Sequence, residues 1–191
     1  MPEDNPLGDR GRAFEEDYFR KRDRELIEKM RKASVAEDAR REMSSRTGLQ
    51  DPAMLQELEA LGFTPDTVAL LPLVPLVQMA WAEGGVSDAE RKLIVKLARV
   101  RRIEEGSAAD RQLTGWLSAR PDPQVFVRAS RLIRAMLDAP AGDHSLSADD
   151  LVKYCESIAA ASGGILGINR VSPEERALLN TIANDLKLRQ S

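Results

Sequence analysis

Acidic side chains recur at one spacing in two short segments, Val86-Ser-Asp-Ala-Glu-Arg91 and Val171-Ser-Pro-Glu-Glu-Arg176, and both segments follow a pair of glycines. Such carboxylates could act as general acids or as ligands of a hard cation. A calcium or magnesium site, however, needs several oxygen ligands at about 2.0–2.6 Å, and the sequence contains no EF-hand spacing of alternating acids. In both segments a serine precedes a glutamate by three residues, which is the spacing of a capping box. We therefore expect Glu90 and Glu175 to begin two helices.

Other residue types give little support for catalysis. His144, the sole histidine, stands in a polar connector without a recognisable nucleophile around it. Cys155, the sole cysteine, excludes an intrachain disulfide and is predicted to be a small buried side chain on a helix. The glycine-rich loop 163–167 lacks the preceding strand and the Gly-Lys-Ser/Thr ending of a P-loop. No acid stands in a context that predicts burial and a raised pKa, so we expect the protein not to be an enzyme.

Composition favours one soluble domain with an appendage. The 191 residues are 42% hydrophobic and 31% charged, with a net charge of -3, which does not suggest a general nucleic-acid binder. The N-terminal segment does not show the basic start and following apolar stretch of a signal peptide, so we expect a cytoplasmic protein. The most apolar segment, 68–82, contains Pro72 and Pro75 and is too short to span a membrane. It is predicted to form two buried helical pieces that are joined at the prolines.

The elements that must position these residues are all predicted to be helices, because no segment shows the period-two pattern of a strand. A long stretch without proline or glycine, rich in Glu, Arg, Lys and Ala, predicts one helix over roughly 12–45. Caps, prolines and apolar spacings of three and four predict the others. They are expected at about 52–61, 64–72, 73–82, 107–117 and 124–137, and from Ser87, Asp149 and Ser172 onward.

Apolar positions on both sides of the acidic motif also correspond, so the chain contains an internal repeat, at about 73–98 and 151–183. Leu73 falls opposite Leu151, and Ile94 falls opposite Leu179. Repeated supersecondary units usually pack on one another and share a core. The sequence therefore predicts an all-α, duplicated helical bundle of about seven to eight helices with a long N-terminal helical extension, divided as 1–48 and 49–191.

The segment Leu71-Pro-Leu-Val-Pro-Leu-Val-Gln-Met-Ala-Trp-Ala-Glu-Gly-Gly-Val-Ser-Asp-Ala-Glu-Arg91 resembles the TerB-like family of tellurite-resistance proteins, and the resemblance covers roughly residues 66–187. In that family an apolar helix ends in an alanine-acid-glycine turn and the next helix opens with an acidic cap. The resemblance implies an all-helical module linked to tellurite resistance and general stress response, without a known catalytic reaction. It also implies that acids at the helix turns bind a divalent cation, the candidate cofactor. By position, the candidate metal ligands are Glu83, Asp88 and Glu90, with Glu174 and Glu175 in the second half.

The N-terminal helix carries a narrow apolar stripe and cannot be buried over its whole length. Its segment Glu15-Glu-Asp-Tyr-Phe-Arg20, followed by Glu25 and Leu26, is similar to the inhibitory helix of the mitochondrial ATP-synthase inhibitor protein. Aromatic side chains beside charges could anchor this helix in a groove of a partner. The candidate partner-binding residues are Phe14, Tyr18, Phe19 and Arg20; packing on the domain or self-association is the alternative use of these aromatics.

The sequence thus predicts a non-enzymatic TerB-like interaction or scaffold module in bacterial stress response or tellurite resistance. Its partner is a protein or a second copy, bound through the N-terminal helix, with no nucleic acid and no membrane span. One alternative is a divalent-metal-binding protein that uses the acidic helix turns. A further alternative is an ATPase-inhibitory protein that acts through the N-terminal helix.

Overall fold

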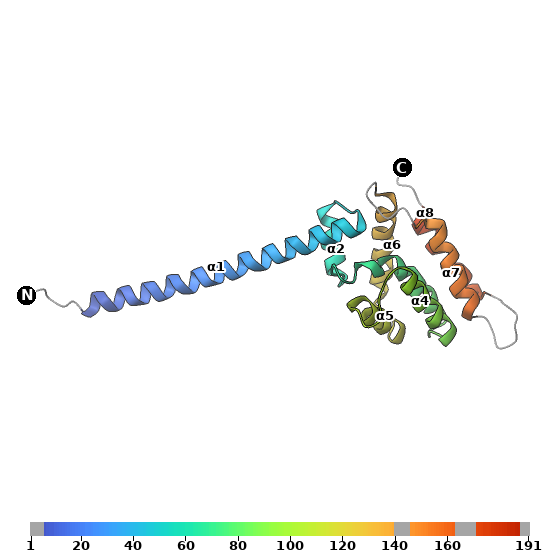
Figure 1. Cartoon of the computed structure of the whole chain (residues 1–191), viewed down its shortest axis with the longest axis horizontal. Helices are drawn as coiled ribbons and strands as arrows, with labels where there is room; N and C mark the ends of the chain where they lie inside the picture. The colour runs from blue at the N-terminus through green and yellow to red at the C-terminus, as the bar shows by residue number, and fades with distance from the viewer. Residues whose placement is uncertain (1–5, 140–145, 163–170, 188–191) are drawn as a thin grey trace, which may run out of the picture. The chain divides into compact units, whose positions relative to one another are not determined.

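The computed structural model describes residues 6–139, 146–162 and 171–187, with side chains from residue 18 onward except that of residue 162. Within these ranges the chain forms eight α-helices, one 3₁₀ helix and no strand, which confirms the predicted all-α fold (Figure 1). It divides into two compact units, Met1–Arg41 and Glu42–Ser191. The elements are α1 (Pro6–Thr47), α2 (Pro52–Ala60), the 3₁₀ helix η1 (Val68–Leu73), α3 (Val74–Ala80), α4 (Asp88–Val100), α5 (Ala108–Ser118), α6 (Pro123–Asp138), α7 (Ala148–Ser162) and α8 (Pro173–Lys187).

The first unit consists of the charged part of α1. Ion pairs one helical turn apart stabilise it, such as Lys32 with Glu28 at 2.7 Å and Arg41 with Glu37. Pairs of this kind contribute about 0.2–0.5 kcal/mol each to a helix. Large apolar side chains of this unit remain exposed. The described helix of this unit is therefore stabilised by helix propensity and local ion pairs, and its apolar side chains are exposed to solvent.

The last turns of α1 belong to the second unit. Met43, Thr47 and Leu49 are all buried there. The Ser44 hydroxyl donates a hydrogen bond to the Leu49 carbonyl at 2.6 Å, and the Leu49 amide donates to the Thr47 hydroxyl at 3.3 Å. The division between the units therefore lies between Arg41 and Glu42, ahead of the predicted boundary after residue 48, because Met43 and Leu49 join the core.

The centre of the second unit is α3, which is buried on every face except at Gln78. It contacts α4, α6, α7 and α8, as expected for a helix that is apolar all round. Pro72 lies within η1 and Pro75 lies in the first turn of α3, so the prolines join two buried helical pieces as predicted. Among the described residues, no helix combines the length and the apolar content that a membrane span requires.

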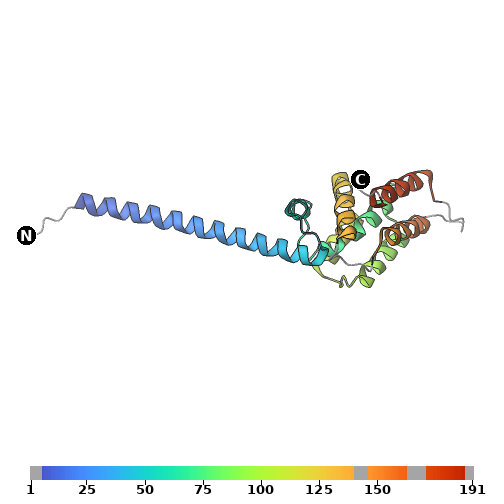
Figure 2. The same cartoon turned by 90° about the horizontal axis from the view of Figure 1, so that it is seen from above.

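The two repeat segments form the pairs α3–α4 and α7–α8, and they pack on one another. α7 lies against α3, α4 and α8, and α6 lies beside α8 (Figure 2). The two repeats have the same capping boxes, but the positions that are buried differ along the helices that follow. In α4 the buried apolar residues are Ile94 and Ala98, whereas in α8 they are Ile182 and Leu186. Corresponding positions therefore start two helices in the same way and then face different neighbours.

Candidate functional site

The repeated acidic motif forms a capping box in each copy. In α4 the Ser87 amide donates to Glu90 Oε2 at 2.7 Å, and the Glu90 amide donates to Ser87 Oγ at 3.3 Å. In α8 the Ser172 amide donates to Glu175 Oε2 at 2.7 Å, and the Glu175 amide donates to Ser172 Oγ at 3.1 Å. Each box satisfies backbone donors that the first turn of a helix leaves without partners. The predicted helix starts are confirmed.

The capping carboxylate of Glu90 has a raised pKa. Glu90 and Glu175 are only 3% and 1% exposed. Burial is the main cause of the raised pKa of Glu90; the hydrogen bonds from Ser87 lower it, and the negative charges of Glu175 and Glu83 raise it further. No acid with a raised pKa was predicted, because the effect depends on burial and on a charge from the other repeat. The hydroxyl and the amide of Ser87 both donate to Glu90 Oε2, each at 2.7 Å, so we interpret Glu90 as a structural residue.

Two substitutions of Glu90 separate its role as a capping acceptor from the effect of its buried charge. A Glu90→Gln variant is expected to be at least as stable as the native chain at neutral pH, because the amide oxygen keeps the capping acceptor and the buried charge is removed. A Glu90→Ala variant loses the acceptor and is expected to be about 1 kcal/mol less stable. Both tryptophans, Trp81 and Trp116, lie in the second unit, so urea unfolding followed by their fluorescence measures this difference.

The same measurement at several pH values tests the direction of the pKa shift. With a raised pKa, the folded chain binds the Glu90 proton more tightly than the unfolded chain does. The contribution of this group to stability therefore grows as pH falls through the raised pKa and levels off below the ordinary glutamate pKa. Glu90→Gln should remove this part of the pH dependence. An unchanged pH profile in Glu90→Gln would show that another group causes it.

The predicted metal ligands are not gathered into one site. Glu83 and Asp88 are exposed, whereas the Glu90 carboxylate is directed into its capping box. In the second half Glu174 is exposed and Glu175 serves the other box. Among the residues that the structure describes, no group of three or more His, Cys, Asp or Glu side chains could hold a metal ion. The capping role of Glu90 is the physical reason, because a carboxylate held by the helix start is not free to converge with its neighbours.

Other candidate chemical groups can be placed only in part. His144 and the glycine-rich loop 163–167 lie outside the described residues. Cys155 is buried on α7, as predicted, and burial together with the nearby charge of Glu156 raises its pKa to about 12. Because the thiolate is the reactive form, this thiol is unreactive at neutral pH.

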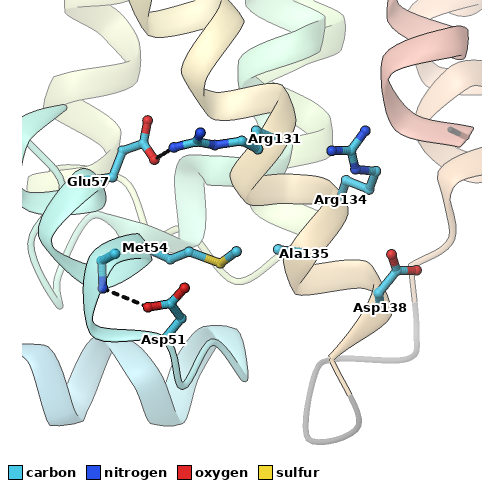
Figure 3. Close-up of a pocket in the computed structure, with 8 residues that line it drawn as sticks. Asp51, Met54, Glu57, Arg131, Arg134, Ala135 and Asp138 are labelled. Atoms are coloured by element: carbon cyan, nitrogen blue, oxygen red, sulfur yellow. Dashed lines mark hydrogen bonds and ion pairs between the residues drawn. The ribbon is translucent and has the colours of Figure 1, made fainter. Parts of the chain in front are cut away.

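A cavity of about 600 Å³ lies in the second unit between α2 and α6 (Figure 3). On one side Glu57, which is buried, accepts a hydrogen bond from Arg128 Nε at 2.9 Å and forms a second ion pair with Arg131. Burial by itself would raise the pKa of Glu57, but the hydrogen bonds and charges of the two arginines outweigh it, so the pKa is lowered. This three-residue cluster joins α2 to α6. Sequence reasoning missed it, because charged residues so far apart in the chain carry no pairing signal.

Most polar groups around this cavity already have structural partners. Asp51 caps α2 by accepting from the Ala53 amide at 2.9 Å, and Arg134 donates to the Asp185 carbonyl at 3.4 Å. Asp138, at the end of α6, is the remaining charged side chain of the lining. The lining combines carboxylates and guanidinium groups that neutralise one another, so the cavity selects no single class of charged ligand.

The first unit offers a surface of a different kind, an exposed apolar face on α1. We define the α1 face as Phe19, Leu26, Ile27 and Met30, whose exposed fractions lie between 56% and 64%. The neighbouring Tyr18 is equally exposed and contacts the Phe19 ring edge-on, with 5.9 Å between ring centroids. Exposed large apolar side chains that gather on one surface mark interaction sites.

The structure places the predicted partner-binding residues on or beside this face where it describes their side chains. Tyr18, Phe19 and Arg20 are exposed, and the side chain of Phe14 lies outside the described ones. The exposed apolar side chains continue beyond Arg20 as far as Met30. The exposed apolar surface of α1 therefore extends past the four predicted partner-binding residues. The helical spacing of Leu26 and Met30 after Phe19 is the sequence signal that extends it.

No family model, curated protein or solved structure matches the chain. The similarities to the TerB-like family and to the ATP-synthase inhibitor protein therefore stay predictions from the sequence. Among the described side chains, those of the α1 face present large apolar groups to solvent in a regular arrangement.

Proposed function

We propose that the chain is a non-enzymatic interaction module that associates through the α1 face, in the cytoplasmic stress-response or tellurite-resistance setting that its TerB-like resemblance implies. The observation that carries the proposal is the exposure of Phe19, Leu26, Ile27 and Met30 on one charged helix. A helix-to-helix contact would bury these side chains, and each large apolar side chain contributes about 1.5–3 kcal/mol when it is fully buried.

The spacing of the face suits another helix as its partner. Phe19, Leu26, Met30 and Ala33 follow one another at intervals of seven, four and three residues, and all four are exposed. This is the spacing of a coiled-coil seam, in which each apolar residue packs between residues of the facing helix. Ile27 flanks the seam and widens it. The apolar part of the seam is short, because charged residues occupy the remaining seam positions.

Those charged seam positions favour a second copy in antiparallel orientation. Asp23 and Glu37 stand in the seam, so a parallel pair would place each carboxylate opposite its own copy, where like charges repel. In an antiparallel pair with Leu26 facing Met30 of the other copy, Asp23 faces Ala33 and Glu37 faces Phe19. No seam carboxylate then meets another one. Glu37 in addition remains ion-paired with Arg41 on its own helix.

Sedimentation equilibrium of the full chain over a range of concentrations tests the proposal. We expect a monomer that converts to a dimer as concentration rises, with little dependence on salt because the seam is mainly apolar. A single monomeric species up to the solubility limit would overturn self-association. Association that disappears with moderate salt would instead assign the contact to the charged sides of the helix and overturn the role of the α1 face.

A further inference from the structure

A second cavity, of about 530 Å³, lies in the second unit among η1, α4 and α7. Its volume falls within the range of about 300–1,000 Å³ that is typical of small-molecule sites. Leu73, Leu146 and Leu151 are buried side chains of the lining, and Leu97 and Tyr154 are half-buried. Leu73 and Leu151 are corresponding residues of the two repeats, so the apolar part of this cavity lies where the repeats meet.

The charged part of the lining has one sign. Arg101 and Arg102 are its charged residues, and no carboxylate is found among the described residues that line it. This contrasts with the cavity between α2 and α6, where carboxylates and arginines occur together. A positively charged lining beside an apolar surface is complementary to a ligand that has an anionic head and an apolar tail.

Arg102 has a backbone conformation that an arginine rarely adopts. Its φ is +61°, in the left-handed region. The turn is a Schellman motif, in which the Arg102 amide donates to the Arg99 carbonyl at 3.0 Å and the Ile103 amide donates to the Ala98 carbonyl at 3.0 Å. Glycine is the preferred residue at this position, because a Cβ atom destabilises left-handed backbone.

The chain itself provides the comparison at the end of α2. There the same motif contains Gly62, with φ +82°, and the Phe63 amide donates to the Leu58 carbonyl at 3.0 Å. At α4 an arginine takes the place of the glycine. The Arg102 side chain forms no hydrogen bond or ion pair with the described part of the chain, so no structural contact there offsets its backbone strain. Strained residues of this kind concentrate at functional sites.

We propose that this cavity binds an amphipathic monocarboxylate of the fatty-acid class. The tail lies against Leu73, Leu146 and Leu151, and the carboxylate is bound by the guanidinium group of Arg102. A small inorganic anion would leave the apolar surface uncovered, and an uncharged apolar ligand would leave the positive charge of Arg102 without a counter-charge. The combination therefore selects a carboxylate that carries a hydrocarbon chain. This site is separate from the α1 face and does not depend on the proposed function.

Calorimetric titration of the full chain with octanoate tests this proposal. We expect saturable binding to the native chain, binding at least tenfold weaker to Arg102→Gly, and most of the affinity retained in Arg102→Lys, which keeps the charge. Octanol, with the same tail and no charge, should bind more weakly than octanoate and respond little to Arg102→Gly. Arg120→Gly, in the loop before α6, serves as a matched arginine control and should leave the affinity unchanged.

A second readout tests the backbone argument independently of the ligand. Without octanoate, Arg102→Gly should raise the Tm by about 2–4 °C, because glycine relieves the left-handed strain. Absence of octanoate binding, equal affinity of Arg102→Gly and the native chain, or equally tight binding of inorganic phosphate would each overturn the proposal. An unchanged or lower Tm in Arg102→Gly would overturn the claim that the arginine is retained at a structural cost.

Discussion

A Leu26→Lys variant is expected to associate at least about a hundredfold more weakly than the native chain. An antiparallel pair contains two equivalent contacts between Leu26 of one copy and Met30 of the other. The substitution therefore removes two buried leucines, each contributing about 1.5–3 kcal/mol. It also places two lysines in the seam. Since lysine and leucine have similar helix propensities, α1 itself should keep its helical content. Analytical ultracentrifugation gives the association constant, and far-UV circular dichroism checks the helix.

Val35→Lys is the matched control for this variant. Val35 is as exposed as the residues of the α1 face, at 64%, but it lies on the opposite side of the helix. The association constant of Val35→Lys should therefore equal that of the native chain. If both variants weaken association equally, net charge rather than the α1 face is responsible. If neither does, the contact lies elsewhere on the molecule.

A Leu76→Ala variant should show the largest loss of stability in the second unit. Leu76 is fully buried on α3, the helix that contacts α4, α6, α7 and α8. Truncating a leucine in such a position removes its transfer free energy and leaves a cavity, so we expect a loss of about 2–5 kcal/mol. Tryptophan fluorescence during urea unfolding is the suitable measurement, because Trp81 donates to the Trp116 carbonyl at 2.8 Å within the same unit.

Gln78→Ala, on the same helix, is the control for Leu76→Ala. Gln78 is the residue of α3 that is not fully buried, and its truncation should change the free energy of unfolding by less than about 1 kcal/mol. Similar losses in the two variants would show that α3 is not the central packing element. A loss confined to Leu76→Ala supports the arrangement of repeats around this helix.

The helices could be predicted because their signals are local. Asp51 followed by Pro52, Ser87 with Glu90, and Ser172 with Glu175 each specify a helix start within a few residues, and the structure contains the corresponding hydrogen bonds. The prolines of the apolar segment likewise marked the junction of η1 and α3. These interactions depend on neighbours in the sequence, and they survive in almost any tertiary context.

The features that could not be predicted depend on residues far apart in the chain. Glu57 pairs with Arg128 and Arg131, which follow it by 71 and 74 residues. The raised pKa of Glu90 depends mainly on burial by the tertiary packing, to which the charge of Glu175, in the other repeat, adds. The left-handed backbone of Arg102 was equally hidden, because the residue type expected there is glycine. For the candidate sites, the sequence located the apolar stripe of α1, but not the cavity beside Arg102.

Disulfide formation between engineered cysteines tests the antiparallel contact of the α1 face most directly. A Leu26→Cys chain and a Met30→Cys chain are mixed and oxidised mildly, and the dimers are identified by mass; the native Cys155 does not interfere because it is buried and has a pKa of about 12. The antiparallel arrangement predicts that the mixed dimer, Leu26→Cys with Met30→Cys, predominates over both self-dimers. Predominant self-dimers would contradict it in favour of a parallel pair, and the absence of any disulfide dimer would contradict association through this face.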